Sequence, residues 1–152
     1  MGASGWEYVV PYEADLQAAL DGLRRQIFAA GEYISPVTWG LSVPESLDAL
    51  CDTERDYYSQ FLGENGTHSI IDVAKVVPYD AGKQEFGTIC AFTNEEYEDL
   101  FDTDQPTYAD YERVHEGPVW DEYVAGRWTG RAIVLWEDGT PSEIVFWGYS
   151  GD

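Results

Sequence analysis

RAIVLW (Arg131–Trp136) and EIVFWGY (Glu143–Tyr149) are two stretches near the end of this chain that are rich in β-branched and aromatic residues. Residues of these types favour β-strands. The connection between the two stretches is EDGTPS (Glu137–Ser142), which is typical of a turn. We therefore expect an antiparallel β-hairpin at this end of the chain.

Both stretches are almost continuously apolar and do not alternate with polar residues. A strand with one face in water alternates, whereas a strand covered on both faces does not need to. We therefore expect helices, or another chain, on both faces of the sheet. The predicted fold is α+β: a single domain over residues 1–152, with an antiparallel β-sheet and helices packed on it.

Other elements are predicted from hydrophobic spacing and from cap and turn residues. The N-terminal part predicts a strand at Trp6–Val10 and a helix at Glu13–Ala30 that ends at Gly31. The remaining predictions are a loop or short edge strand at Tyr33–Val43, a helix from Ser42 to Leu62 with a break near Asp52-Thr53, strands at Ser69–Val77 and Phe86–Phe92, and helices at Thr93–Phe101 and from Pro106 to Val114 that Gly117-Pro118 ends.

The 152 residues carry a formal net charge of -21, yet 44% of them are hydrophobic and 15% aromatic. Disordered acidic chains are poor in aromatic residues, so this composition indicates a folded domain with an acidic surface. Such a surface repels nucleic acid and anionic lipid, and it attracts basic proteins, polyamines or metal cations. The acidity also fits a second explanation, a compositional background from a GC-rich or salt-adapted genome.

Cysteine usage and the N-terminal sequence indicate where the protein acts. Cys51 and Cys90 are far apart and have no histidine at zinc-ligand spacing, so we expect two reduced thiols and no metal site or cofactor. The chain shows no signal peptide and no apolar run of membrane-spanning length. We expect a cytoplasmic protein.

Acidic residues are concentrated between Asn94 and Glu122, where eleven carboxylates and one arginine give a net charge of -10 in 29 residues. Tyrosine and tryptophan residues are interleaved with them. Carboxylates steer basic partners, and tyrosine and tryptophan dominate binding hot spots. The residues predicted to contact a partner are Glu95, Glu96, Tyr97, Glu98, Asp99, Asp102, Asp104, Tyr108, Asp110, Tyr111, Glu112, Glu116, Trp120, Asp121, Glu122 and Tyr123.

The function that this pattern favours is binding to a basic protein, such as a toxin, a nuclease or a DNA-binding protein, in the manner of an immunity protein or of a nucleic-acid mimic. Spaced carboxylates offer Lys and Arg the same anionic partner that phosphates do. The other interpretation of the same segment is a solvated helical face with its aromatic residues turned inward.

The alternative function is a small enzyme or ligand-binding domain with a pocket near the C-terminal hairpin, in which His68 or His115 would act as an acid or base. Motif evidence for catalysis is weak. The chain has no glycine-rich phosphate loop, and the acid-rich stretch that starts at Asp102 lacks the ligand pattern of a calcium loop. We expect Arg127 and Arg131 to pair with surplus carboxylates.

Overall fold

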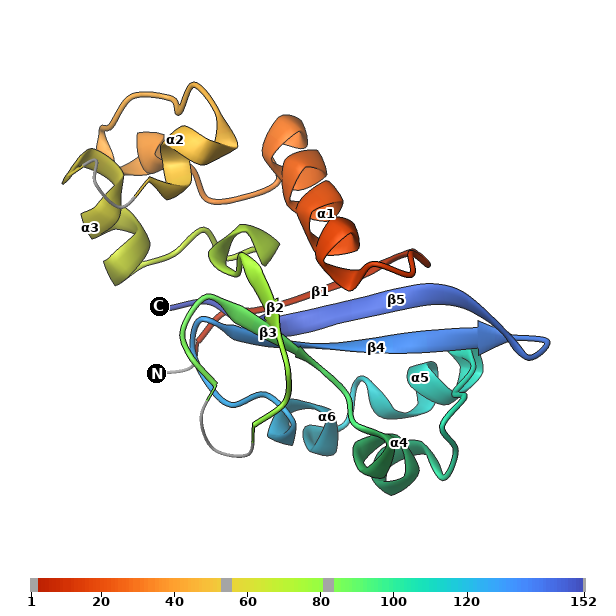
Figure 1. The fold of residues 1–152 in the computed structure, drawn as a ribbon. Coiled ribbons are helices and arrows are strands. Elements are labelled where there is room, and N and C mark those ends of the chain that lie inside the picture. Colours follow the sequence, from red (N-terminus) through yellow and green to blue (C-terminus); the bar gives the residue numbers. More distant parts are fainter. Residues whose placement is uncertain (1–2, 53–55, 81–83, 152) are drawn as a thin grey trace.

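The sheet has five strands in the order β1-β5-β4-β3-β2, and helices cover both of its faces (Figure 1). The computed structural model describes residues 3–52, 56–80 and 84–151. The strands are β1 (Gly5–Pro11), β2 (Lys75–Val77), β3 (Thr88–Ala91), β4 (Thr129–Glu137) and β5 (Thr140–Tyr149). The α+β class is confirmed.

The sheet is mixed, so the prediction of a purely antiparallel sheet is wrong. β1 and β4 pair antiparallel with β5, whereas β3 pairs parallel with both β4 and β2. The reason is the order of elements, because three helices separate β3 from β4. A strand followed by helices and then by a neighbouring strand forms a crossover, and a crossover returns the chain in the same direction.

The C-terminal hairpin is confirmed, and its turn is tighter than predicted. β4 and β5 are joined by Asp138-Gly139 alone, and both residues have positive φ, 51° and 76°. Two successive residues with positive φ form the two-residue turn whose twist matches that of the strands. Thr140 and Pro141, predicted as part of the connection, therefore belong to β5.

One layer of helices lies on the upper face in Figure 1. The cap of α1 is Asp15, whose side chain accepts a hydrogen bond from the Ala18 N–H, and Gly31 ends the helix with φ 69°. This layer packs against Trp6, Ile144 and other upward-facing strand residues. Its helices are α1 (Leu16–Ala30), η1 (Pro36–Trp39), α2 (Leu47–Cys51), α3 (Asp56–Glu64) and η2 (Ile70–Asp72).

Two predictions in this layer are corrected. The helix expected from Ser42 begins after Ser46, whose side chain accepts a hydrogen bond from the Ala49 N–H. Asp52 ends α2 in an extended conformation, and the predicted break at Thr53 lies outside the described residues. The strand expected from Ser69 is shortened because η2 occupies its first part, and β2 begins only at Lys75.

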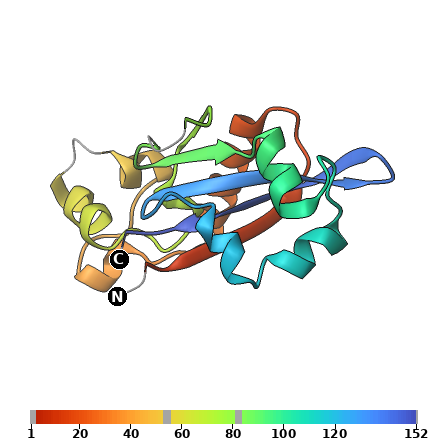
Figure 2. The same cartoon turned by 90° about the horizontal axis from the view of Figure 1, so that it is seen from below.

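The second layer, on the lower face, consists of α4 (Asn94–Phe101), α5 (Tyr108–Val114) and α6 (Pro118–Glu122) (Figure 2). The capping residue predicted for α4, Thr93, exchanges hydrogen bonds with Glu96. Thr107 exchanges hydrogen bonds with Asp110 in the same way at the start of α5. α5 ends at Val114, before Gly117-Pro118 as predicted, and Pro118 then occupies the first turn of a further helix, α6, where its missing N–H costs nothing.

The chain buries one core on each side of the sheet. In β5, Ile144 and Phe146 face the upper layer, whereas Val145 and Trp147 face the lower layer. Alternate residues of a strand point to opposite faces. The continuous apolar run in β5 is therefore explained, and the prediction that both faces are covered is confirmed.

Candidate functional site

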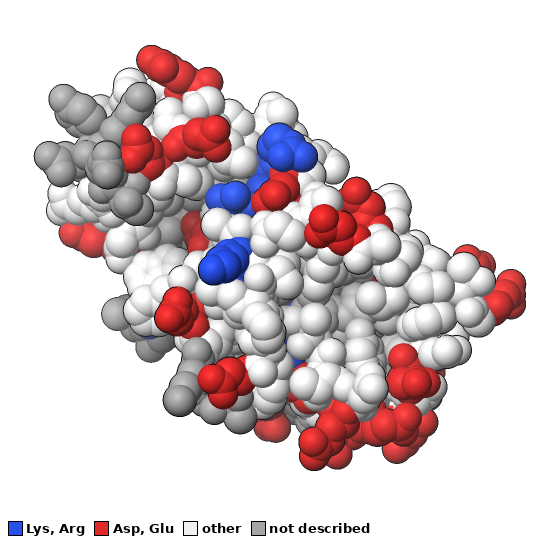
Figure 3. All heavy atoms as spheres, viewed as in Figure 1, with Lys and Arg blue, Asp and Glu red and all other residues white. Residues whose placement is uncertain are grey.

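Acidic side chains gather over the lower layer, along the lower rim of the molecule near α4 and α5 (Figure 3). Most carboxylates of the predicted contact set are exposed: Glu95, Glu98, Asp99, Asp102, Asp104, Glu112, Glu116, Asp121 and Glu122. Further acidic side chains lie at the opposite end, by α2 and α3, and the basic side chains in this view lie beside α1 and the start of β2. The negative charge thus has a dense region, but it is not confined to one side.

Two of the predicted aromatic anchors belong to the core. Tyr111 is 4% exposed and Trp120 is 2% exposed. Trp120 stacks on Trp147 with ring centroids 3.9 Å apart, and its edge contacts Tyr111. Because α5 and α6 turn these rings toward the sheet, neither ring can contact a partner, and their assignment to the contact surface is corrected.

The other aromatic residues of the set differ in exposure. Tyr97 and Tyr123 are half-buried and both contact Phe92, with ring centroids 5.4 and 5.0 Å away. The Tyr97 hydroxyl accepts a hydrogen bond from the Val134 N–H at 2.8 Å. Tyr108 alone among the five predicted aromatic anchors is exposed, at 45%.

Two carboxylates of the set are occupied within the fold. Asp110 accepts a hydrogen bond from the Thr107 N–H at 2.8 Å and pairs with Arg113. Glu96 accepts from the Thr93 N–H at 2.9 Å and pairs with Arg131. Both carboxylates therefore already have bonds within the fold, and a protein partner that contacts them would compete with these bonds.

Arg131 is 3% exposed, and its hydrogen bonds connect several segments of the chain. Its guanidinium forms two parallel hydrogen bonds with the Glu96 carboxylate, at 2.8 and 2.5 Å. The remaining N–H groups donate to the carbonyls of Cys90, Ala91 and Tyr123. All donors of the guanidinium are thus matched, as a buried charge requires. The expected pairing of Arg131 with a carboxylate is confirmed.

Aromatic rings enclose the same guanidinium. Its carbon lies 5.1 Å from the ring centroid of Tyr79 and 4.9 Å from that of Phe92. Rings at such distances attract a cation through their electron-rich faces. The Tyr79 ring keeps 47% of its surface exposed, so it also borders the solvent in front of Arg131.

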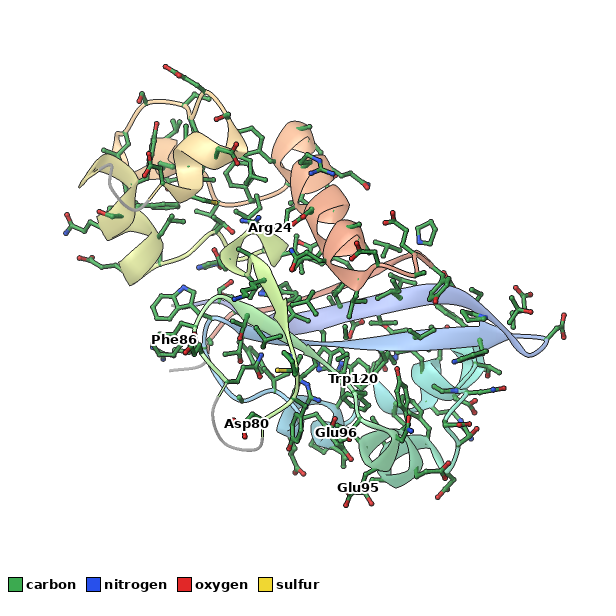
Figure 4. The ribbon with its side chains drawn as sticks, in the orientation of Figure 1. Arg24, Asp80, Phe86, Glu95, Glu96 and Trp120 are labelled. Atoms are coloured by element: carbon green, nitrogen blue, oxygen red, sulfur yellow. The ribbon has the colours of Figure 1, made fainter. Side chains whose placement is uncertain are left out.

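A hollow of about 620 Å³ opens in front of Arg131. It lies beyond the carboxyl ends of β2 and β3, the position where ligands bind in parallel sheets. Cys90 and Arg131 contribute to its lining, as do Tyr79 and Tyr123. Four further carboxylates line it: Asp80, Glu95, Asp99 and Glu122. Figure 4 labels two of them, Asp80 and Glu95.

None of the ion pairs formed between described residues uses these four carboxylates. Glu95, Asp99 and Glu122 belong to the predicted set, whereas Tyr79 and Asp80 do not, because they follow β2 and lie far away in sequence. The signal that could have found them is the parallel pairing of β2 with β3, which places both strand ends at one edge of the sheet.

The thiol of Cys90, which lines the hollow, is poorly suited to nucleophilic attack. Burial raises the pKa of the Cys90 thiol, and a raised pKa lowers the thiolate fraction that attacks substrates. Neither histidine lines the hollow. The His115 ring instead stacks on Tyr111, with centroids 4.6 Å apart.

Across the part of the chain that the structure describes, no three or more His, Cys, Asp or Glu side chains form a group that could hold a metal ion. In that same part, no helix has the length and apolar character needed to cross a bilayer. Comparison with protein-family models, with curated proteins and with solved structures finds no match to this chain.

Proposed function

We propose that this protein binds and neutralises a basic protein, and that the hollow receives an arginine or lysine side chain of that partner. The observation that carries the proposal is the set of four carboxylates around the hollow, Asp80, Glu95, Asp99 and Glu122, which no described cation engages. The cation already present, Arg131, is neutralised by Glu96 and does not repel an incoming one.

Two electrostatic features favour binding of a cationic side chain of the partner. The carboxylates at the rim create a negative potential that speeds the encounter with a basic surface. Within the hollow, a guanidinium meets carboxylate oxygens that accept in pairs and the open face of the Tyr79 ring. The buried Arg131 guanidinium already has the same two kinds of contact, with the Tyr79 ring and with the Glu96 carboxylate.

The partner class follows from what such a surface imitates. Proteins that bind nucleic acid carry arginine and lysine spaced to meet phosphates, and a row of exposed carboxylates offers them the same anions. We propose a nuclease, a DNA-binding protein or a basic toxin as the partner, with the cytoplasm as the place of action. Direct binding to nucleic acid or to an anionic membrane is disfavoured by the charge of -21.

Reversal of three rim charges tests the proposal. Glu95→Lys, Asp99→Lys and Glu122→Lys are combined, and affinity for a nine-residue arginine peptide is measured by calorimetry at low salt. The matched control reverses three exposed acids elsewhere, Glu13, Glu32 and Glu137, and has the same net charge. We expect the rim variant to bind at least about tenfold more weakly than the control variant.

Equal affinities of the two variants would contradict the proposal, because binding would then follow total charge and not the hollow. The natural partner is sought by capture from the lysate of the source cell at low and at high salt. A basic protein that is captured by the wild type, and lost with the rim variant but not with the control variant, supports the proposal.

A further inference from the structure

The two edges of the sheet differ in how their backbone groups are used. At the β2 edge, the Gln17 side chain of α1 covers the strand: its amide nitrogen donates to the Ala74 carbonyl at 3.0 Å, and its amide oxygen accepts from the Val76 N–H at 2.8 Å. An added strand would have to displace these bonds. The β2 edge is therefore closed to another chain.

β1 forms the opposite margin of the sheet (Figure 2). The Ser150 N–H donates to the Ser4 carbonyl, and the Tyr12 N–H donates to the Ser142 carbonyl. These two bonds lie in register with the β1–β5 pairs, so even-numbered residues of β1 direct their backbone groups toward β5. The odd-numbered residues direct theirs outward.

The outward groups of Gly5, Glu7 and Val9 take part in no backbone hydrogen bond within the described residues. Pro11 has the same parity and lacks an N–H, which fits a position where the ladder to β5 needs none. Alternate residues of β1 thus present backbone donors and acceptors that no described residue uses, and this is the template that an added strand needs.

Side chains beside this edge are suited to a basic segment. The Glu7 carboxylate accepts hydrogen bonds from the Tyr111 hydroxyl and from the Trp120 Nε1–H, the latter at 3.0 Å. Those two donors hold the carboxylate at the lower face while the residue remains exposed. Val9, on the same face, is 38% exposed and offers an apolar contact. A residue placed opposite Glu7 on an added strand would meet an uncompensated negative charge.

We propose that the β1 edge takes up an extended segment of the basic partner as a sixth strand, with a lysine or arginine opposite Glu7. The inference rests on the proposed function for the sign of the partner's charge, and it names a second contact, away from the hollow. A second copy of this chain is the wrong occupant, because each copy carries a charge of -21 and would place Glu7 against like charge.

Amide hydrogen exchange read by NMR tests the inference. The probe is a seven-residue peptide of alternating lysine and valine, and the control probe is the same peptide with alternate backbone nitrogens methylated. In the free protein we expect fast exchange at Gly5, Glu7 and Val9. The unmodified peptide should slow exchange at these three amides at least about tenfold, and the methylated peptide should not.

A variant pair gives a second reading. Val9→Pro removes one outward donor and leaves the bonds to β5 in place, whereas Val9→Thr keeps the donor and the branched side chain. We expect the proline variant to bind the peptide about tenfold more weakly than the threonine variant, as strand pairing requires. If the proline variant unfolds, the methylated peptide still decides.

Several outcomes would overturn the inference: equal binding of the methylated peptide, unprotected amides at β1 with shift changes only around the hollow, or self-association that protects the same amides. If the β1 amides stay unprotected and shifts change only around the hollow, the proposed function is supported and the contact at the β1 edge is ruled out. Protection at β1 together with unchanged binding of the arginine peptide by the rim variant would mean the reverse, a valid edge contact without the acidic hollow.

Discussion

The two layers that cover the sheet bury their ionisable groups differently. In the lower layer, the Arg131 guanidinium has a partner for each of its donors, and Glu96 is fixed by both Arg131 and Thr93. In the upper layer, the Arg24 Nε and one oxygen of Asp72 are buried without a hydrogen-bond partner. Both residues line a cavity of about 180 Å³.

The difference shows which charges serve the fold. In the lower layer the buried charges of Arg131 and Glu96 are matched within the fold. The ion pairs between described residues do not use the four carboxylates around the hollow, which we propose to serve a partner. In the upper layer a buried carboxylate is incompletely satisfied and lowers stability when it is ionised.

The largest effect is expected where the matched pair of the lower layer is broken. Arg131→Met leaves the Glu96 carboxylate buried without its cation, and we expect a loss of about 3–5 kcal/mol in the free energy of unfolding. Urea denaturation followed by tryptophan fluorescence measures it. Arg127→Met, at an exposed position, is the control and should change stability by less than about 0.5 kcal/mol.

A loss below about 1 kcal/mol for Arg131→Met would remove the contrast between the layers, because water or a shifted neighbour would then replace the guanidinium at little cost.

A smaller loss is expected at the contact between β1 and the lower layer. Glu7→Ala removes the acceptor for the Tyr111 hydroxyl and the Trp120 Nε1–H. We expect a loss of about 1–2 kcal/mol, because water reaches this exposed residue and replaces part of the bonding. Glu13→Ala is the matched control. Equal stability of the two variants would show that the bonds to Glu7 contribute nothing.

Glu7 also affects the titration of Tyr111. Burial, followed by the hydrogen bond and the charge of Glu7, raises the pKa of the Tyr111 hydroxyl. In the Glu7→Ala variant the contribution of Glu7 is lost, so Tyr111 should ionise at a lower pH than in the wild type. Ultraviolet absorbance of tyrosinate, compared between the two proteins, checks the direction.

The upper layer predicts a stability difference that depends on pH. Burial raises the pKa of the Asp72 carboxyl, while the hydrogen bond that it accepts from the Thr67 N–H opposes the shift. A raised folded-state pKa means that the unfolded chain loses this proton first as the pH increases. The contribution of Asp72 to stability therefore declines from the unfolded pKa, about 3.9, up through the folded pKa.

Asp72→Asn keeps the shape of the side chain and cannot ionise. We expect it to exceed the wild type in stability by about 1 kcal/mol at pH 7, with a difference that shrinks as the pH falls toward 4. Thermal unfolding of both proteins between pH 4 and 8 measures it. A difference that grows toward low pH would mean that the ionised carboxylate is stabilised in the fold.

Local signals in the sequence predicted much of the fold. The helix that starts after Thr93, the helix that ends at Gly31 and the C-terminal hairpin depend on residues a few positions apart, and all three were predicted. The parallel pairing of β3 with β4 was missed, although the helices predicted between the two strands already indicated a crossover connection. The helix predicted from Ser42 begins only after the cap Ser46.

The site was predicted only in part. Carboxylates that alternate with aromatic residues along a helix look like a mixed surface, yet α5 and α6 turn Tyr111 and Trp120 inward. The ion pair between Glu96 and Arg131 joins two positions that are 35 residues apart in the sequence. Asp80 joins the hollow from a third segment. Such contacts depend on how the sheet places distant segments of the chain. Residues that are neighbours in sequence therefore do not indicate them.

The most direct test of the account is the salt dependence of arginine-peptide binding by the wild type and by the variant with Glu95, Asp99 and Glu122 reversed. We expect the logarithm of the wild-type affinity to fall steeply as the logarithm of salt concentration rises, and the slope of the rim variant to be clearly shallower, with the free energy of unfolding unchanged within about 0.5 kcal/mol. Identical slopes, or a rim variant that unfolds, would contradict the claim that these carboxylates serve a partner and not the fold.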